Sequence, residues 1–201
     1  MSKKENGLKR GYIQVYTGNG KGKTTAALGL ALRAVGRGLR VHMIQFMKRW
    51  GVGEHLAAKQ LGSDLQIEQV GQPYLCARGG DLDKKTRESL PDDVVVFTPE
   101  NPPQKMLESA QRGLEKAHNI MQNCSADILI LDEINVAADY EFISQSELLK
   151  LMDSKPAGME LILTGRNAKP DIIEKADLVT EMQEIKHYYQ QGVTARNGIE
   201  K

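Results

Sequence analysis

Three glycines and two lysines stand close together near the start of the chain, in the stretch TGNGKGKTT of residues 17–25. Alternating glycines let a loop turn its backbone N–H groups towards phosphate oxygens, and a lysine adds a positive charge. In the phosphate-binding pattern G-x-x-x-x-G-K-[ST], the last three positions match Gly22, Lys23 and Thr24. The first glycine of that pattern falls on Thr17, so a loop that starts at Gly18 is one residue short. The stretch therefore predicts a phosphate loop of unusual length.

Two carboxylates, Asp132 and Glu133, end the apolar run DILILDE of residues 127–133. Alone, such a run is more typical of a buried strand whose acids cap the next turn. Together with the loop it indicates a Walker B strand, which places a carboxylate beside the Mg²⁺ of a bound nucleotide. The hydroxyl of Thr24 can reach the same ion. The two stretches predict one Mg-nucleotide site.

The group that this site transfers stays open at the level of motifs. No Ser-His-Asp or Cys-His constellation is evident, and no HRD-type loop follows a strand. Glu133 could orient a water molecule, so hydrolysis of ATP remains one alternative.

Composition narrows the class of protein. The 201 residues, 40% of them hydrophobic, suit a single globular domain over residues 1–201. Lys and Arg number 27 and Asp and Glu 26, so no net field favours nucleic acid or a membrane surface, and a nucleic-acid motor is disfavoured. The polar start, the lack of a long apolar run and two distant cysteines predict a cytoplasmic protein with no membrane partner.

Strand-like and helical patterns alternate along the chain, which predicts an α/β fold with a mostly parallel sheet between two helical layers. Residues 1–11 are expected to be a flexible N-terminus, 71–103 a variable loop segment with short pieces of structure, and the last sixteen residues a surface or site covering. The expected strands are 12–17, 40–46, 65–70, 127–133, 159–165 and 176–182, and the expected helices are 24–37, 54–62, 104–122, 144–154 and a short one after Pro170.

Larger segments resemble one family, the ATP:corrinoid adenosyltransferases of the cob(I)alamin or cob(I)yrinic acid a,c-diamide type. The likeness covers residues 12–54 and 126–200 and rests on VYTGNGKGKTTAALGLALRAVGRGLRV, QFMK, GE, DILILDEIN, LTGRNAKPDIIEKADLVTEM and KHYYQQGVTARNGIE. The shortened phosphate loop is itself a mark of the family.

The resemblance implies a homodimeric P-loop fold that transfers the 5′-deoxyadenosyl group of ATP to the Co(I) centre of a reduced corrinoid. Triphosphate leaves intact, because the short loop holds it the opposite way round from ordinary P-loop enzymes and exposes the ribose 5′-carbon. Since Co(I) is the nucleophile, no general base is needed. The family also implies Mg²⁺ and a flavoprotein electron donor.

Site residues follow from the same resemblance. Lys23, Thr24 and Glu133 are the expected catalytic residues, and Thr24 with Asp132 or Glu133 is expected to hold Mg²⁺. The expected corrinoid residues are Gln45, Phe46, Lys48 and Tyr74, although Phe46 is equally suited to the core. The expected ATP-binding residues are Gly18, Asn19, Gly20, Lys21, Gly22, Lys23, Thr24, Thr25, Arg166 and Arg196, with surface ion pairing as the alternative for the two arginines.

The middle of the chain departs from the family. A Phe and Trp pair is expected after the third strand, against the lower face of the corrin, but this chain has GQPYLCARGGD there, with Tyr74 and no tryptophan. A regulator that binds nucleotide and has lost corrinoid binding is therefore a second hypothesis, and a P-loop ATPase is a third.

Overall fold

The computed structural model describes residues 7–48, 53–71, 74–76, 94–98 and 100–200, with the backbone alone for 74–76. The strands are β1 (Ile13–Thr17), β2 (Val41–Gln45), β3 (Leu65–Gln69), β4 (Tyr74–Cys76), β5 (Val95–Phe97), β6 (Ile128–Asp132), β7 (Glu160–Thr164) and β8 (Leu178–Glu181). The helices are α1 (Lys23–Val35), α2 (Gly53–Leu61), α4 (Gln104–Gln122), α5 (Ile134–Asp139), α6 (Gln145–Asp153) and α7 (Pro170–Lys175), with 3₁₀ turns η1 (Gly62–Asp64) and η2 (Tyr188–Gln191).

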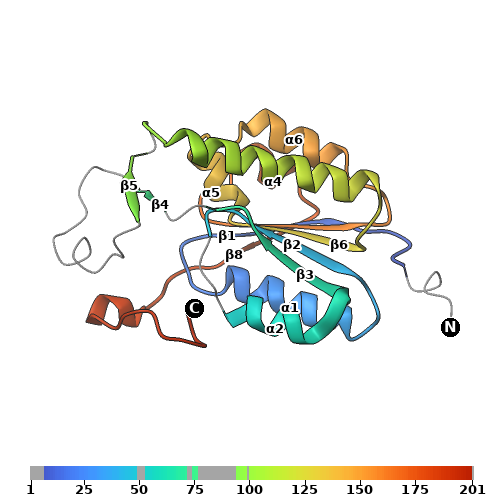
Figure 1. The fold of residues 1–201 in the computed structure, drawn as a ribbon, viewed down its shortest axis with the longest axis horizontal. Coiled ribbons are helices and arrows are strands. Elements are labelled where there is room, and N and C mark those ends of the chain that lie inside the picture. The colour runs from blue at the N-terminus through green and yellow to red at the C-terminus, as the bar shows by residue number, and fades with distance from the viewer. Residues whose placement is uncertain (1–6, 49–52, 72–73, 77–93, 99, 201) are drawn as a thin grey trace.

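Six strands form one parallel sheet in the order β3-β2-β6-β7-β1-β8. Helices α1 and α2 cover one face, and α4, α5 and α6 cover the other (Figure 1). Because all six strands run the same way, their carboxyl ends meet at one edge of the sheet, where α/β proteins bind ligands. The predicted α/β fold with a central parallel sheet is confirmed.

Strand β6 shows why this sheet forms from an unbroken apolar run. All five of its residues are buried. Leu129 and Leu131 pack into the apolar cluster shared with α4 and α6, whereas Ile128 and Ile130 pack into the cluster shared with α1 and α2. A parallel strand covered on both faces loses the polar alternation of a half-exposed strand, so its length and its β-branched residues carry the signal.

Each predicted strand and helix of the sheet domain is found, with bounds that differ by a few residues. Helix α5 was not predicted, because its six residues follow the Asp132–Glu133 pair directly and are too few to show a helical period. Within the segment 71–103, the short parallel strands β4 and β5 pair with each other, and residues 77–93 lie outside the described part. The flexible N-terminus stays a prediction, since residues 1–6 are not described.

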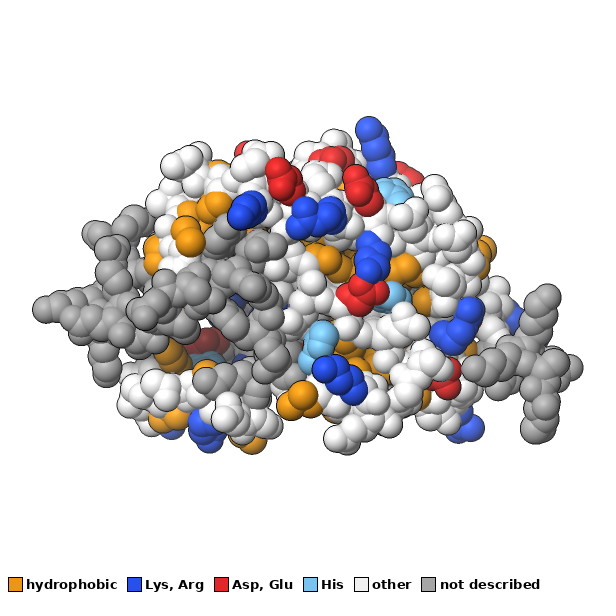
Figure 2. Space-filling model, viewed as in Figure 1, with side chains coloured by type: hydrophobic (Ala, Val, Ile, Leu, Met, Phe, Trp, Pro, Cys, Tyr) orange, Lys and Arg blue, Asp and Glu red, His pale blue; other side chains and the backbone are white. Residues whose placement is uncertain are grey.

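The surface agrees with the balanced composition. Acidic and basic side chains are interspersed on the face drawn in Figure 2, and neither sign dominates the coloured part of it. In the described part of the chain, no helix combines the length and the apolar character that a membrane span requires.

Candidate active site

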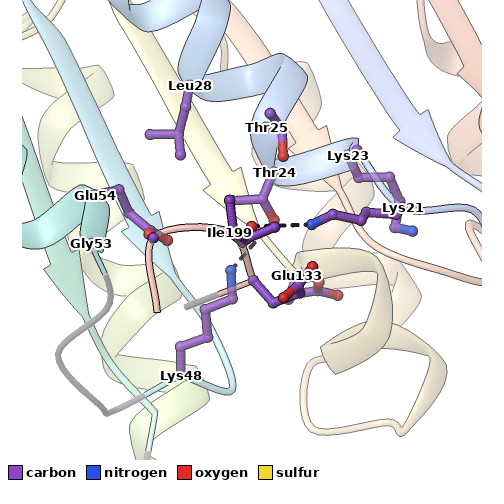
Figure 3. Close-up of a pocket in the computed structure, with 13 residues that line it drawn as sticks. Lys21, Lys23, Thr24, Thr25, Leu28, Lys48, Gly53, Glu54, Glu133 and Ile199 are labelled. Carbon is purple, nitrogen blue, oxygen red and sulfur yellow. Dashed lines mark hydrogen bonds between the residues drawn. The ribbon is translucent and has the colours of Figure 1, made fainter. Parts of the chain in front are cut away.

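A cleft of about 590 Å³ opens at the carboxyl edge of the sheet. It lies between the start of α1, the chain after β2, the start of α2, the residue after β6 and the C-terminal segment (Figure 3). The residues that line it are Lys21, Gly22, Lys23, Thr24, Thr25, Leu28, Lys48, Gly53, Glu54, Glu133, Gly198, Ile199 and Glu200.

The loop between β1 and α1 forms one wall, and close packing explains its glycines. Gly18 has a φ of 90°, and a Cβ there would lie 2.4 Å from the carbonyl oxygen of Met182. A Cβ on Gly20 would meet the backbone of Met182 and Gln183 at 2.8 Å. The Gly20 N–H donates to the Met182 carbonyl at 2.7 Å. The short loop is therefore pressed directly onto the chain that leaves β8, where only glycine fits.

Lys23 opens helix α1 with its ammonium tucked beneath this loop. The residue is only 7% exposed, and its Nζ donates to the carbonyls of Gly18 and Gly20, each at 2.8 Å. Burial lowers the pKa of Lys23 from its ordinary value, while the nearby carboxylate of Glu133 opposes that shift. A cation held by two neutral carbonyls is available to an anion that enters the cleft.

Asp132 is the centre of a buried network behind the cleft. Its Oδ1 accepts from the hydroxyls of Thr24 at 2.8 Å and Thr164 at 2.7 Å. Its Oδ2 accepts from Nζ of Lys48 at 2.6 Å and from Nε2 of Gln45 at 3.2 Å. The last bond follows from sheet register, since Gln45 lies directly beside Asp132 across β2 and β6. Four donors thus fix a carboxylate that is 0% exposed.

The side chain of Glu133 enters the cleft, whereas that of Asp132 is buried behind it. The backbone of Glu133 is left-handed, with φ 60°, and its N–H donates to the Thr164 hydroxyl at 3.0 Å. This turn carries the side chain into the cleft. Burial, and then the charge of Asp132, raise the pKa of Glu133, while Lys48 and Lys23 oppose the shift. A carboxylate in this position gains from any cation that enters the cleft.

Oxygen donors suited to a hard divalent cation therefore meet at one place. The Thr24 hydroxyl touches Asp132, and Glu133 follows in the chain. The ammonium of Lys48 lies 2.6 Å from Asp132 Oδ2 and 3.4 Å from Thr24 Oγ1, so these oxygens already attract a positive charge. Among the described residues no three His, Cys, Asp or Glu side chains form a metal cluster. A metal here would take further ligands from phosphate or water, as Mg²⁺ does.

Comparison with known proteins decides the family. A model of the family "ATP:corrinoid adenosyltransferase BtuR/CobO/CobP" matches residues 9–200. The chain belongs to this family. Proteins named "Corrinoid adenosyltransferase" from Sinorhizobium sp and Escherichia coli (strain K12) are each 34% identical over 95% of this chain, which covers 80% and 86% of them. "Corrinoid adenosyltransferase CobA" of Salmonella typhimurium is 32% identical over 95% of this chain and 86% of its own length.

Five of the ten residues that were assigned to ATP through the resemblance line the cleft of this corrinoid adenosyltransferase family member. Lys21, Gly22, Lys23, Thr24 and Thr25 line it, as do Lys48 and Glu133. The other loop glycines, Gly18 and Gly20, lie behind the wall and supply carbonyls to Lys23. Asn19 is exposed beside them and is not among the lining residues.

Two residues expected at the corrinoid are buried instead. Phe46 is 1% exposed and lies against Gly113 of α4, where a Cβ would come within 2.6 Å of its ring. The structure therefore places Phe46 in the core, because it continues β2 on the face covered by α4. Gln45 is 0% exposed and serves the Asp132 network. The side chain of Tyr74 lies outside the described part, and its assignment stays a prediction.

The two arginines take different places. Arg166 is exposed, yet its charge acts on both Lys23 and Glu133. Arg196 pairs with Glu200 at 3.1 Å, and its guanidinium lies 4.8 Å from the centre of the Tyr188 ring. Arg196 thus makes a surface ion pair, which was the alternative to its expected role in ATP binding. The pair lies in the C-terminal segment that lines the cleft.

Sequence reasoning missed two parts of the wall. Glu54 and Leu28 line the cleft from α2 and α1. Glu54 was part of the family likeness, but nothing local to its sequence marks it as a site residue. The C-terminal segment also lines the cleft, and Nζ of Lys21 donates to the carbonyl of Ile199 at 3.3 Å. Its polar composition predicted a surface or site covering without saying which residues enter the cleft.

Proposed function

We propose that this protein transfers the 5′-deoxyadenosyl group of ATP to the Co(I) centre of a reduced corrinoid. The bond between the ribose 5′-carbon and the triphosphate oxygen breaks, and a cobalt–carbon bond forms. Both electrons of the new bond come from Co(I), which becomes Co(III), and triphosphate leaves with the electrons of the broken bond. The name of the family and the names of its relatives support this reaction.

The observation that carries the proposal is the content of the cleft. Two lysines, Lys21 and Lys23, and the start of α1 form a cationic wall that suits a triphosphate. Among the described residues that line the cleft there is no Ser, Cys or His side chain. Three lysines and three glutamates line the described part of the cleft, and no Ser-His or Cys-His pair is among them, which suits a reaction whose nucleophile arrives with the substrate. The protein then contributes position and charge stabilisation of the leaving triphosphate.

Mg²⁺ belongs to the same proposal, with Thr24, Asp132 and Glu133 as its residues. Bound there, it would neutralise charge on the triphosphate as that group leaves. The catalytic roles of Lys23, Thr24 and Glu133 and the corrinoid role of Lys48 are part of this proposal.

The proposal also includes a cytoplasmic location, a homodimer, and a flavoprotein that supplies the electrons that reduce the corrinoid. The edge strand β8 supports a second copy, because all four of its residues are exposed, including Leu178 at 44% and Val179 at 40%. An exposed edge strand that carries apolar side chains normally needs a cover.

The test is an anaerobic reaction of the purified protein with Mg-ATP and chemically reduced cob(I)alamin. Equal amounts of adenosylcobalamin and inorganic triphosphate are the expected products. ADP and phosphate in place of triphosphate would contradict the proposal and indicate the ATPase. ATP binding with neither product, for cob(I)alamin and for other reduced corrinoids, would indicate the regulator.

A further inference from the structure

A buried threonine, Thr164, lies between the strand that leads to the phosphate loop and the strand that ends in the acidic pair. It is the last residue of β7 and pairs with Tyr16 of β1. On the other side of β7, the preceding residue Leu163 pairs with Leu131 of β6. Thr164 is 0% exposed and is not one of the described residues that line the cleft. A ligand in the cleft therefore meets Thr164 only through other residues.

The fold of β7 does not require a hydroxyl at this position. The three residues before Thr164 are apolar and buried. Valine has nearly the shape of threonine and a similar preference for strands, so it would serve the packing of the sheet equally well. A buried hydroxyl is unfavourable unless it is hydrogen-bonded. The reason for the threonine must therefore lie in the hydrogen bonds that its hydroxyl makes.

Both of these hydrogen bonds go to the two residues at the end of β6. The Thr164 hydroxyl donates to Oδ1 of Asp132 at 2.7 Å and accepts from the backbone N–H of Glu133 at 3.0 Å. A hydroxyl has a single hydrogen. Because the Asp132 carboxylate takes that hydrogen, a lone pair of the same oxygen is left for the N–H of Glu133. One side chain thus fixes the point at which the chain turns from β6 into α5.

The turn at Glu133 is one that glutamate does not favour by itself. Its φ of 60° and ψ of 20° are left-handed, a conformation that is unfavourable for any residue with a Cβ. The Glu133 side chain does not cap α5. It points into the cleft instead (Figure 3). The bond from its N–H to Thr164 therefore helps to hold a turn whose effect is to bring a carboxylate into the cleft.

Loss of the Thr164 hydroxyl would act mainly on Glu133 and much less on Asp132. Asp132 would keep three donors, the side chains of Thr24, Gln45 and Lys48. The N–H of Glu133 would lose its acceptor, and an unpaired N–H is unfavourable in the folded state. The turn would then gain by changing to the common right-handed conformation, which would move the Glu133 carboxylate.

We propose that Thr164 is a positioning residue that holds the Glu133 carboxylate in the nucleotide cleft. It acts through the backbone of Glu133 and does not touch the ligand. The inference rests on the proposed function in taking Mg-ATP as the ligand and Glu133 as part of its site. It predicts that Thr164 and Glu133 contribute to the binding of Mg-ATP as one unit.

The test is a double-mutant cycle on the affinity for Mg-ATP, measured by titration calorimetry. Thr164→Val removes the hydroxyl with little change of shape, and is expected to weaken binding about 10- to 100-fold, as loss of a contact that orients a metal ligand does. Glu133→Gln should weaken it at least as much. Because the threonine acts through the glutamate, the double variant should bind about as weakly as Glu133→Gln alone.

Two further variants separate this role from a general effect on the sheet. Thr164→Ser keeps the hydroxyl and is expected to restore most of the affinity that Thr164→Val loses. Thr180→Val makes the same change on the exposed strand β8 and is expected to bind Mg-ATP as the wild type does.

Losses of affinity that multiply in the double variant would overturn the inference, because Thr164 would then act independently of Glu133. Wild-type affinity in Glu133→Gln or in a folded Thr164→Val protein would also overturn it. If Thr164→Val does not fold, amide exchange of Glu133 in the wild type and the affinity of Thr164→Ser decide. Exchange at the rate of an unprotected amide, or a serine variant as weak as Glu133→Gln, would contradict the inference.

Adenosyl transfer is assayed separately on the wild type, so the two proposals can fail independently. A cycle in which the losses do not multiply, found in a protein without transfer activity, would retain the role of Thr164 and contradict the proposed function. Multiplying losses in an active adenosyltransferase would do the reverse.

Discussion

The phosphate loop and the C-terminal segment form two walls of one cleft, yet they are built in different ways. The loop is packed backbone to backbone against Met182 and Gln183, and its lysine is buried beneath it. The C-terminal wall is held by exposed contacts. Tyr188 donates to the carboxylate of Glu200, which also pairs with Arg196 at 3.1 Å.

Under the proposed function, the buried loop stabilises the leaving triphosphate and the exposed C-terminal segment limits access to the cleft. Groups fixed by close packing keep their geometry when salt or pH changes, as preorganised stabilisation of a leaving triphosphate requires. Exposed ion pairs are screened by salt and contribute little to stability. The contact of Lys21 with the Ile199 carbonyl is therefore one that a nucleotide can replace.

The largest expected effect is that of Lys23→Ala in the buried wall. Removing the cation that faces the triphosphate is expected to reduce kcat/KM for adenosyl transfer by about 10²- to 10³-fold. Lys105→Ala, on the exposed face of α4, is the matched control and should leave the rate unchanged. A near-normal rate in the Lys23 variant would show that the loop wall does not stabilise the leaving group.

Asp132→Asn tests the network behind that wall. The variant places an amide NH₂ against donors that now bind a carboxylate, since Lys48, Gln45 and both threonine hydroxyls point at Asp132. We expect affinity for Mg-ATP to fall about 10- to 100-fold. Calorimetric titration with and without Mg²⁺ measures it, and an equal loss without the metal would contradict the metal assignment.

A pair of glycine substitutions compares the two walls directly. Gly18→Ala combines φ 90° with a Cβ 2.4 Å from a carbonyl oxygen, and should lower the free energy of unfolding by about 2 kcal/mol or more. Gly198→Ala has φ 77°, but a Cβ there meets no described atom within 4 Å, so about 1 kcal/mol is expected. Urea unfolding measures both. Equal losses would mean that packing does not distinguish the walls.

Titration of Glu133 should act on stability with a definite sign. Its pKa is raised above the ordinary 4.5, first by burial and then by Asp132. The folded state thus binds this proton more tightly than the unfolded state, and its stabilising effect is lost as pH rises from 4.5 through the folded pKa. Glu133→Gln should therefore raise Tm at pH 7 without ATP and leave it unchanged below pH 4. A lower Tm at pH 7 would contradict this.

The C-terminal wall should show the opposite sign and the smallest effect. Its hydrogen bonds to Arg196 and Tyr188 lower the pKa of Glu200 from 4.5 to about 2. The contribution of this carboxylate is therefore present above pH 4.5 and lost as pH falls towards 2. Amide exchange of residues 188–200 should quicken in Glu200→Gln and in high salt, with Tm nearly unchanged. Amide exchange rates that change neither in Glu200→Gln nor in high salt would show that other contacts hold the segment.

Local sequence was a sufficient guide where one segment carries the whole signal. The spacing of Gly22, Lys23 and Thr24 predicted the loop at the start of α1, and the apolar run before Asp132 predicted β6. It did not give side-chain direction at the end of β2, where the resemblance led us to expect Gln45 and Phe46 beside the corrinoid. A strand covered on both faces shows no alternation, so its sequence does not say which side chains leave the core.

The sequence by itself determined the family, the parallel α/β fold and the cationic loop, because these depend on residue types at fixed local spacings. Only the tertiary structure decided that Glu54 faces the cleft through Gln45, that Gly198, Ile199 and Glu200 form its third wall, and that Arg196 closes that wall upon Glu200. These contacts join residues from separate elements. Such distances are set by how helices and loops pack on the sheet, and no local pattern contains them.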